Sequence, residues 1–128
     1  AYAKVPIREV EPEEKEEVLF KLGYSAFQIG DMETSYDAFR DVKDGSTQYA
    51  KPSLYFYSHI SYTRNALQVA LEGFQKLRTD STFCGVVPYY IAQILHKQGK
   101  YQEVIDFAPT VLSCSIVNNE SDIQQRSN

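Results

Sequence analysis

The 128-residue sequence predicts an all-α protein in which antiparallel helix pairs repeat along the chain and stack on one another. Three observations support this prediction. Turn residues divide the chain into segments of about 11–16 residues, which is an ordinary helix length. Within these segments, apolar residues recur at the three- and four-residue steps of a helix face. Similar residues also recur from one pair of segments to the next, at a spacing of 34 or 35 residues.

The first helix is expected to begin at Pro12 and to end at Gly30. Proline suits the first turn of a helix, where a missing N–H leaves no bond unmade, and glycine tolerates the left-handed conformation that ends helices. Several glutamates lie in the first turns of this segment, where their negative charge complements the positive end of the helix dipole. An acidic docking patch is the alternative interpretation of the same glutamates. Apolar residues follow helical steps at Val18, Leu19, Leu22, Ala26 and Ile29.

Four further groups of turn residues separate the remaining segments, at 43–47, 64–65, 79–82 and 98–100. Residues 55–62 could be interpreted as a strand, because aromatic residues favour strands. Pro52, three residues before Tyr55, and the helical pattern of the neighbouring segments favour a helix start instead. Helical spacing recurs later in the chain at Ala66, Val69, Ala70, Phe74 and Leu77, and again at Ile91, Ile94 and Leu95.

Six columns of similar residues share the same repeat register. They are Gly30/Asn65/Gly99, Leu22/Tyr57/Ile91, Gly23/Ser58/Ala92, Ser35/Ala70/Val104, Phe39/Phe74/Ala108 and Val42/Leu77/Val111. Glycine or asparagine permits the tight turn inside each pair. A small residue on each helix, such as Gly23 with Ser35 in the first pair, permits close helix crossing. Large apolar residues then fill the space toward the next pair, because a single pair cannot bury its own face.

The motifs Leu22-Gly23, Gly30-Asp31-Met32, Ala70 with Phe74, and Gly99-Lys100-Tyr101 resemble the tetratricopeptide repeat (TPR) family over residues 16–112. The resemblance implies a right-handed α-α superhelix, or α-solenoid, of three antiparallel helix pairs. The implied repeats are residues 12–46, 47–80 and 81–112. Residues 1–11 form a lead-in that resembles the tail of a preceding helix. Residues 113–128 form a polar segment that either starts a further helix or is a frayed tail. The chain departs from the family pattern at several positions, such as Pro88 in place of an early aromatic residue. With these departures it resembles a divergent bacterial branch of the family, which is found in long cell-envelope proteins. The resemblance also implies that the chain is a fragment of a longer repeat protein.

In this family the first helix of each pair lines a concave surface that binds peptides or partner helices. The resemblance therefore implies a partner-binding face. Its residues here are Tyr24, Gln28, Tyr55, His59, Tyr62, Tyr89, Gln93, His96 and Lys97. Tyrosine suits such a face, because it combines rigid apolar area with a hydroxyl group.

The competing interpretation is that aromatic residues at helical spacing belong to the core. That interpretation is favoured for Phe20, Phe27, Phe56 and Tyr57, whereas Tyr24, Tyr55, Tyr62 and Tyr89 are expected to be partly exposed. The family's clamp for a terminal carboxylate needs lysine, arginine and asparagine, but the matching positions include Phe20, Phe56 and Tyr90. A neutral or apolar ligand segment is therefore favoured.

Composition and motifs argue against several other functions. The net charge is −4 and no basic face is visible, so no nucleic-acid partner is expected. No apolar run approaches the roughly 20 residues that a spanning helix needs, so no membrane insertion is expected. Motifs for nucleophilic catalysis or phosphate binding are absent, and His59 and His96 lack a third ligand at metal-binding spacing. We therefore expect no enzyme activity, no cofactor and no metal.

Two functions remain. The first is a non-catalytic protein–protein interaction module that binds a peptide or protein segment on an aromatic-rich concave face. The alternative is a structural spacer that stacks on flanking repeats of a parent chain and has no ligand of its own. Uncapped repeat ends expose apolar faces, so we also expect a weak homodimer through them. The resemblance to cell-envelope repeats favours location in the periplasm or cell envelope, with the cytoplasm as the alternative. A disulfide between Cys84 and Cys114 stays open, because the sequence does not give the distance between their Cα atoms.

Overall fold

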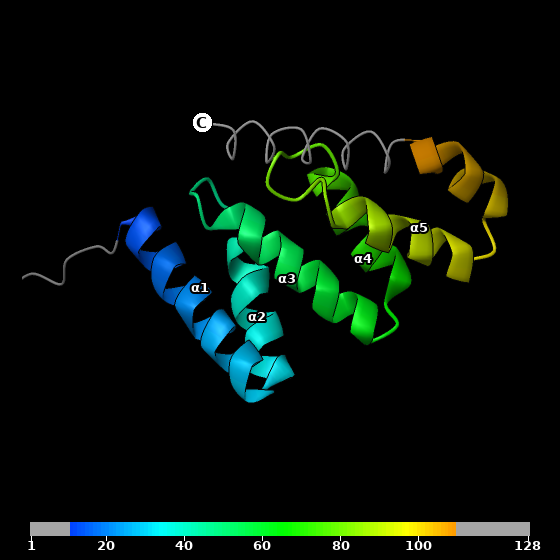
Figure 1. The fold of residues 1–128 in the computed structure, drawn as a ribbon. Coiled ribbons are helices and arrows are strands. Elements are labelled where there is room, and N and C mark those ends of the chain that lie inside the picture. The colour runs from blue at the N-terminus through cyan, green and yellow to red at the C-terminus, as the bar shows by residue number, and fades with distance from the viewer. Residues whose placement is uncertain (1–10, 110–128) are drawn as a thin grey trace, which may run out of the picture. The chain divides into compact units, whose positions relative to one another are not determined.

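The computed structural model describes residues 11–109 and consists of helices joined by short turns (Figure 1). The helices are α1 (Pro12–Ile29), α2 (Met32–Val42), α3 (Ala50–Thr63), α4 (Leu67–Leu77) and α5 (Val87–Lys97). Helix is also described over residues 101–109. Between residues 11 and 109 there is no strand, and neighbouring helices pack as adjacent pairs, α1 with α2 and α4 with α5. The all-α prediction is confirmed, and the strand interpretation of residues 55–62 is wrong, because they lie inside α3.

The chain forms two compact units, and the boundary between Phe56 and Tyr57 lies inside α3. The first unit contains α1, α2 and the beginning of α3. The second contains the end of α3, α4, α5 and the helix over residues 101–109. The repeat boundaries at 46/47 and 80/81 stay predictions. The lead-in before residue 11 and the segment 113–128 lie outside the described residues.

Three turns share one backbone conformation, as the first repeat column predicted. Gly30, Asn65 and Gly99 have φ values of 86°, 64° and 76°, all in the left-handed region. In each turn, the residue that follows donates its backbone N–H to a carbonyl in the last turn of the preceding helix, at 2.8–2.9 Å. These bonds satisfy carbonyl groups that the helix end would otherwise leave unpaired. These turns between consecutive helices therefore follow directly from residue type.

Close crossing of α1 and α2 depends on two small residues. The Ser35 hydroxyl donates a hydrogen bond of 2.8 Å to the carbonyl oxygen of Gly23. A Cβ atom added at Gly23 would lie 2.8 Å from the Phe39 ring, which is fully buried. The predicted pairing of Gly23 with Ser35 is thus confirmed at the atomic level.

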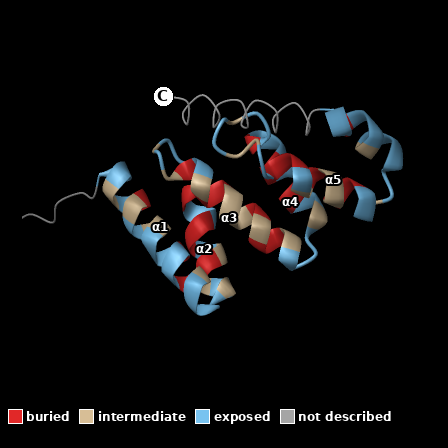
Figure 2. Ribbon diagram, in the orientation of Figure 1, coloured by how far each residue is buried: buried red, intermediate tan, exposed pale blue. Residues whose placement is uncertain are grey.

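The outer surface of α1 differs from what the apolar steps along this segment suggest. Val18, Leu22 and Ile29 are exposed by 64%, 47% and 81%, and exposed positions cover much of α1 in Figure 2. The small residues Gly23 and Ala26 are buried instead. Because α2 approaches α1 along this small-residue side, Val18, Leu22 and Ile29 form an exposed stripe on α1.

An equivalent aromatic stack occurs once in each unit. In the first unit the rings of Phe39 and Phe56 stack with centroids 5.1 Å apart and planes 14° apart. In the second unit Phe74 and Tyr90 stack at 5.0 Å and 8°. Phe39 and Phe74 belong to one repeat column, and both are fully buried. The register read from the sequence is therefore matched by a repeated contact in space.

Candidate functional site

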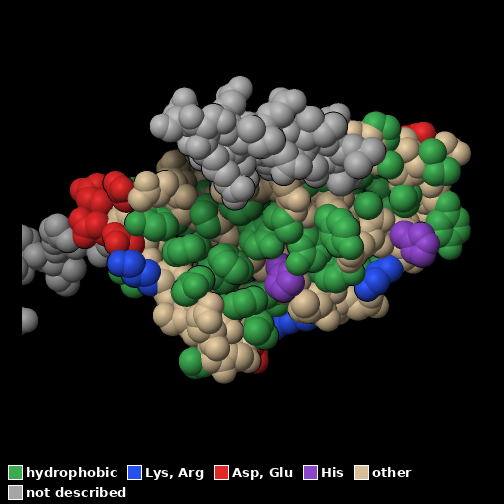
Figure 3. Space-filling model, in the orientation of Figure 1, with side chains coloured by type: hydrophobic (Ala, Val, Ile, Leu, Met, Phe, Trp, Pro, Cys, Tyr) green, Lys and Arg blue, Asp and Glu red, His purple; other side chains and the backbone are tan. Residues whose placement is uncertain are grey.

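A groove of about 330 Å³ runs along α5, and four residues of the predicted face line it. They are Tyr89, Gln93, His96 and Lys97. The helix that holds them begins at Val87 with a proline in its first turn and ends at Lys97. Steps of three and four residues place all four on one side of α5. In Figure 3, hydrophobic side chains gather over α5 and the end of α3, with basic and histidine side chains among them.

Tyr62 connects the end of α3 to this groove. Its hydroxyl donates a hydrogen bond of 2.9 Å to Gln93 Oε1. The ammonium of Lys97 lies 4.5 Å from the centroid of the Tyr62 ring, within the range of a cation–π contact. Tyr62 is half-buried and contacts two of the residues that line the groove, Gln93 and Lys97. The structure thus brings together five of the nine predicted face residues.

His59 packs against Tyr90, which lies next to Tyr89 on α5. The two rings meet edge to face, with centroids 5.7 Å apart and planes 81° apart. Tyr62 meets the same Tyr90 ring at 5.6 Å and 73°. Burial lowers the pKa of His59 below its usual value of 6.5, because the charged imidazolium loses solvation. A neutral His59 therefore prevails at neutral pH.

Tyr90 organises the ring contacts of this site, although it was not among the nine residues expected to bind a partner. It contacts His59, Tyr62 and Phe74 at once. The sequence holds a signal for this role, because Tyr90 follows Phe56 by 34 residues, a repeat spacing already found in the columns. An aromatic column Phe56/Tyr90 would have identified both stacking positions.

The predicted residues of the first unit surround a different centre. Tyr24 and Tyr55 both meet the Phe56 ring edge-on, with centroids 6.0 and 5.5 Å away. Tyr24 is 45% exposed, Tyr55 is half-buried and Gln28 is exposed. Phe27 also packs on Phe56, at 5.3 Å. Tyr24 therefore offers the most accessible aromatic surface of this group.

Partial exposure of the four tyrosines is confirmed, whereas their contact with a partner stays a prediction. Tyr89 is the most exposed of them, at 62%. Phe20, Phe27, Phe56 and Tyr57 are each half-buried. Phe20 and Phe56 also meet the buried Phe39 ring, at 5.8 and 5.1 Å.

The two histidines have separate surroundings. His96 meets the Tyr101 ring edge-on at 5.3 Å, whereas His59 contacts Tyr90. Among residues 11–109, no three or more histidine, cysteine, aspartate or glutamate side chains gather as a metal site would need. No helix in the same range has the length and apolarity to cross a membrane. Cys84 is disulfide-bonded, and the other cysteine, Cys114, lies outside the described residues.

Comparisons with protein-family models, with curated proteins and with solved structures found no match to this chain.

Proposed function

We propose that this chain is a non-catalytic protein–protein interaction module, which binds a peptide or protein segment in the groove along α5. The observation that supports this most directly is the convergence of Tyr89, Gln93, His96 and Lys97 on one groove, beside Tyr62. Aromatic rings and hydrogen-bonding groups in one concave surface are typical of protein-binding sites.

The groove chemistry specifies the kind of segment that fits. The exposed Tyr89 ring offers apolar area at low cost in conformational entropy. Gln93 Oε1 accepts from Tyr62, which orients the amide so that its NH₂ group can donate hydrogen bonds to a ligand. Lys97 adds a cation beside it. The partner segment therefore combines an apolar side chain with an acceptor, such as a backbone carbonyl or a carboxylate.

The finer architecture belongs to this proposal. We place the helix pairs in a right-handed α-α superhelix of three TPR-like repeats. The paired stacks Phe39–Phe56 and Phe74–Tyr90 support it, because equivalent positions make equivalent contacts. The partner is a protein or peptide, and the module uses no cofactor and no nucleic acid. We assign it to the periplasm or cell envelope, and the disulfide at Cys84 is consistent with an oxidising compartment.

A second candidate function rests on the exposed stripe of α1. Val18, Leu22 and Ile29 occupy one side of that helix and are largely exposed. Stacking of a flanking repeat on this side would bury them, as a structural spacer requires. Without a flanking repeat to cover it, the same stripe would support weak self-association.

Sedimentation equilibrium tests this second function. The double variant Leu22→Ser/Ile29→Ser should abolish self-association, and Tyr89→Ala should leave it unchanged.

A peptide-display library selected on the full chain tests the interaction module. Peptides enriched on the wild type should bind Tyr89→Ala and Lys97→Gln roughly tenfold more weakly, as loss of an interface anchor requires. Ile105→Ala and Lys76→Gln serve as matched controls, because Ile105 and Lys76 are exposed and lie outside the groove. Failure to enrich any peptide, or equal binding to Tyr89→Ala, would refute the groove as a binding site and favour the spacer.

A further inference from the structure

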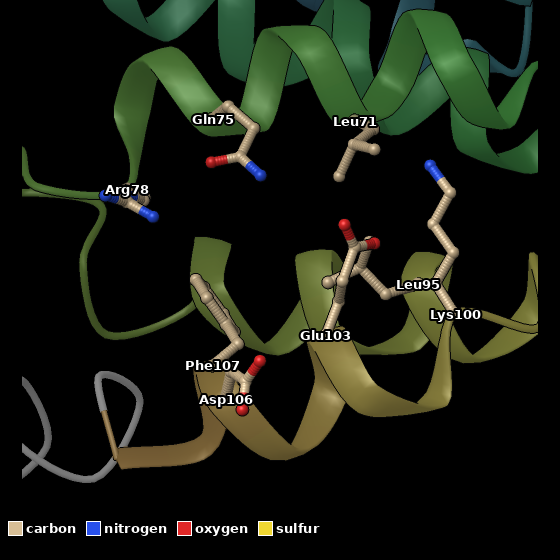
Figure 4. A pocket seen from close by; sticks show the side chains of 8 residues that line it. All are labelled: Leu71, Gln75, Arg78, Leu95, Lys100, Glu103, Asp106 and Phe107. Atoms are coloured by element: carbon tan, nitrogen blue, oxygen red, sulfur yellow. The ribbon is translucent and has the colours of Figure 1, made fainter.

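A second cavity of about 350 Å³ lies in the second unit, between α4 and the helix over residues 101–109. It shares no lining residue with the groove along α5. Figure 4 shows the side chains of both helices facing across it. The volume is at the lower end of the range for small-molecule sites, so a small ligand is the appropriate occupant.

The floor of this pocket is apolar. Leu71 from α4, Leu95 from α5 and Phe107 from the last described helix are all buried and all line it. A ligand held here would therefore place an aliphatic group on these three side chains, because burial of apolar surface is favourable.

The rim is charged, and no ion pair involves its charges in the described part of the chain. The side chains of Arg78, Lys100 and Glu103 make no ion pair or hydrogen bond with one another or with other residues of 11–109. Figure 4 places Arg78 and Lys100 at opposite ends, with Glu103 between them. Asp106 adds a second carboxylate and accepts a 3.0 Å hydrogen bond from Gln102. Two cations and two carboxylates give a rim with no net charge.

We infer that this pocket binds a free α-amino acid with an apolar side chain. The ligand carboxylate pairs with Arg78 or Lys100, the ammonium pairs with Glu103, and the side chain lies on Leu71, Leu95 and Phe107. A zwitterion uses both signs of charge on the rim, and a free amino acid carries both on one carbon atom, which suits a pocket of about 350 Å³. Because the rim is exposed to solvent, each charged contact contributes modestly, and a dissociation constant on the order of 1 mM is expected.

An NMR titration of the isotope-labelled full chain tests this inference, with L-leucine as the probe. Isocaproate, which lacks the amino group, and isoamylamine, which lacks the carboxylate, are the matched ligands. Leucine should produce saturable shifts at amides within 71–78 and 95–107. Each single-charge ligand should bind about twofold to fivefold more weakly, as expected for one lost solvent-exposed charged contact.

Two variants assign the charges. Glu103→Gln should weaken leucine and remove its advantage over isocaproate, and the double variant Arg78→Gln/Lys100→Gln should remove its advantage over isoamylamine. Glu72→Gln and Lys76→Gln are the controls, because both residues are exposed and neither lines the pocket. Circular dichroism checks that each variant is folded. The inference is overturned by an absence of saturable shifts, by shifts elsewhere in the chain, or by single-charge ligands that bind as tightly as leucine. It is equally overturned if the charge variants preserve the wild-type preference.

Discussion

Replacing Gly23 by alanine tests the closest helix crossing in the first unit. The added methyl group would lie 2.8, 2.9 and 3.0 Å from three carbon atoms of the Phe39 ring. Carbon atoms normally approach to about 3.5–4.0 Å, so the overlap is close to 1 Å. The ring has no free space to move into, because it is fully buried and stacked on Phe56 at 5.1 Å.

Opposing effects set the size of the change. Alanine at a helix interior gains about 1 kcal/mol over glycine from helix propensity. Overpacking of a rigid core costs about 1–3 kcal/mol. Separation of the helices would also weaken the hydrogen bond from Ser35 to the Gly23 carbonyl, worth about 1 kcal/mol. Overpacking and the weakened bond together outweigh the propensity gain, and the free energy of unfolding should fall by about 1–3 kcal/mol.

Urea denaturation followed by circular dichroism measures this change, and a double-mutant cycle assigns its cause. Phe39→Leu shortens the side chain opposite Gly23, so Gly23→Ala should be less destabilising in that background than in the wild type. Ser25→Ala, at an exposed position of the same helix, is the control. Stabilisation by Gly23→Ala, or additive effects of the two substitutions, would refute close packing as the reason for glycine.

Three further predictions concern the second unit. Asn65→Ala should lower the free energy of unfolding by about 1 kcal/mol, because Asn65 has a φ of 64°, and Asn65→Gly should not; urea denaturation compares the two. Tyr62→Phe removes the 2.9 Å hydrogen bond to Gln93 and should cost about 0.5–1.5 kcal/mol in the same assay, and no loss would mean that water replaces the hydroxyl. The pKa of His59 lies below the unfolded value of 6.5, so the unfolded chain takes up a proton first, and stability should fall as pH drops below 6.5 toward the folded pKa. An NMR titration of His59 measures its pKa, and a value above 6.5 would contradict the burial argument.

Helices and turns were predictable because their causes are local in sequence. Gly30, Asn65 and Gly99 act through backbone conformation alone, so residue type was sufficient. Pro12 likewise marks the first residue of α1. Helical spacing of apolar residues then predicted the segments between the turns, and the repeat register correctly paired Gly23 with Ser35.

The candidate site was only partly predictable, because it depends on contacts between helices. Helical spacing placed Gln93 and Lys97 on one side of α5, but the role of Tyr62 emerged from its hydrogen bond and cation contact across helices. The central role of Tyr90 could not be predicted for the same reason, since its three ring contacts come from α3 and α4. Spacing along one helix cannot say which side a neighbour covers, and the exposed Leu22 on α1 shows this most clearly.

The paired ring stacks also bear on how the chain folds. Phe39 reaches Phe56 across 17 residues, and Phe74 reaches Tyr90 across 16. Contacts between residues so near in sequence need little loop closure, and such topologies fold quickly. Each stack can form independently of the other, so folding can nucleate at either of two equivalent sites. Hydrogen exchange should then report separate opening events for the two halves of the chain rather than one global transition.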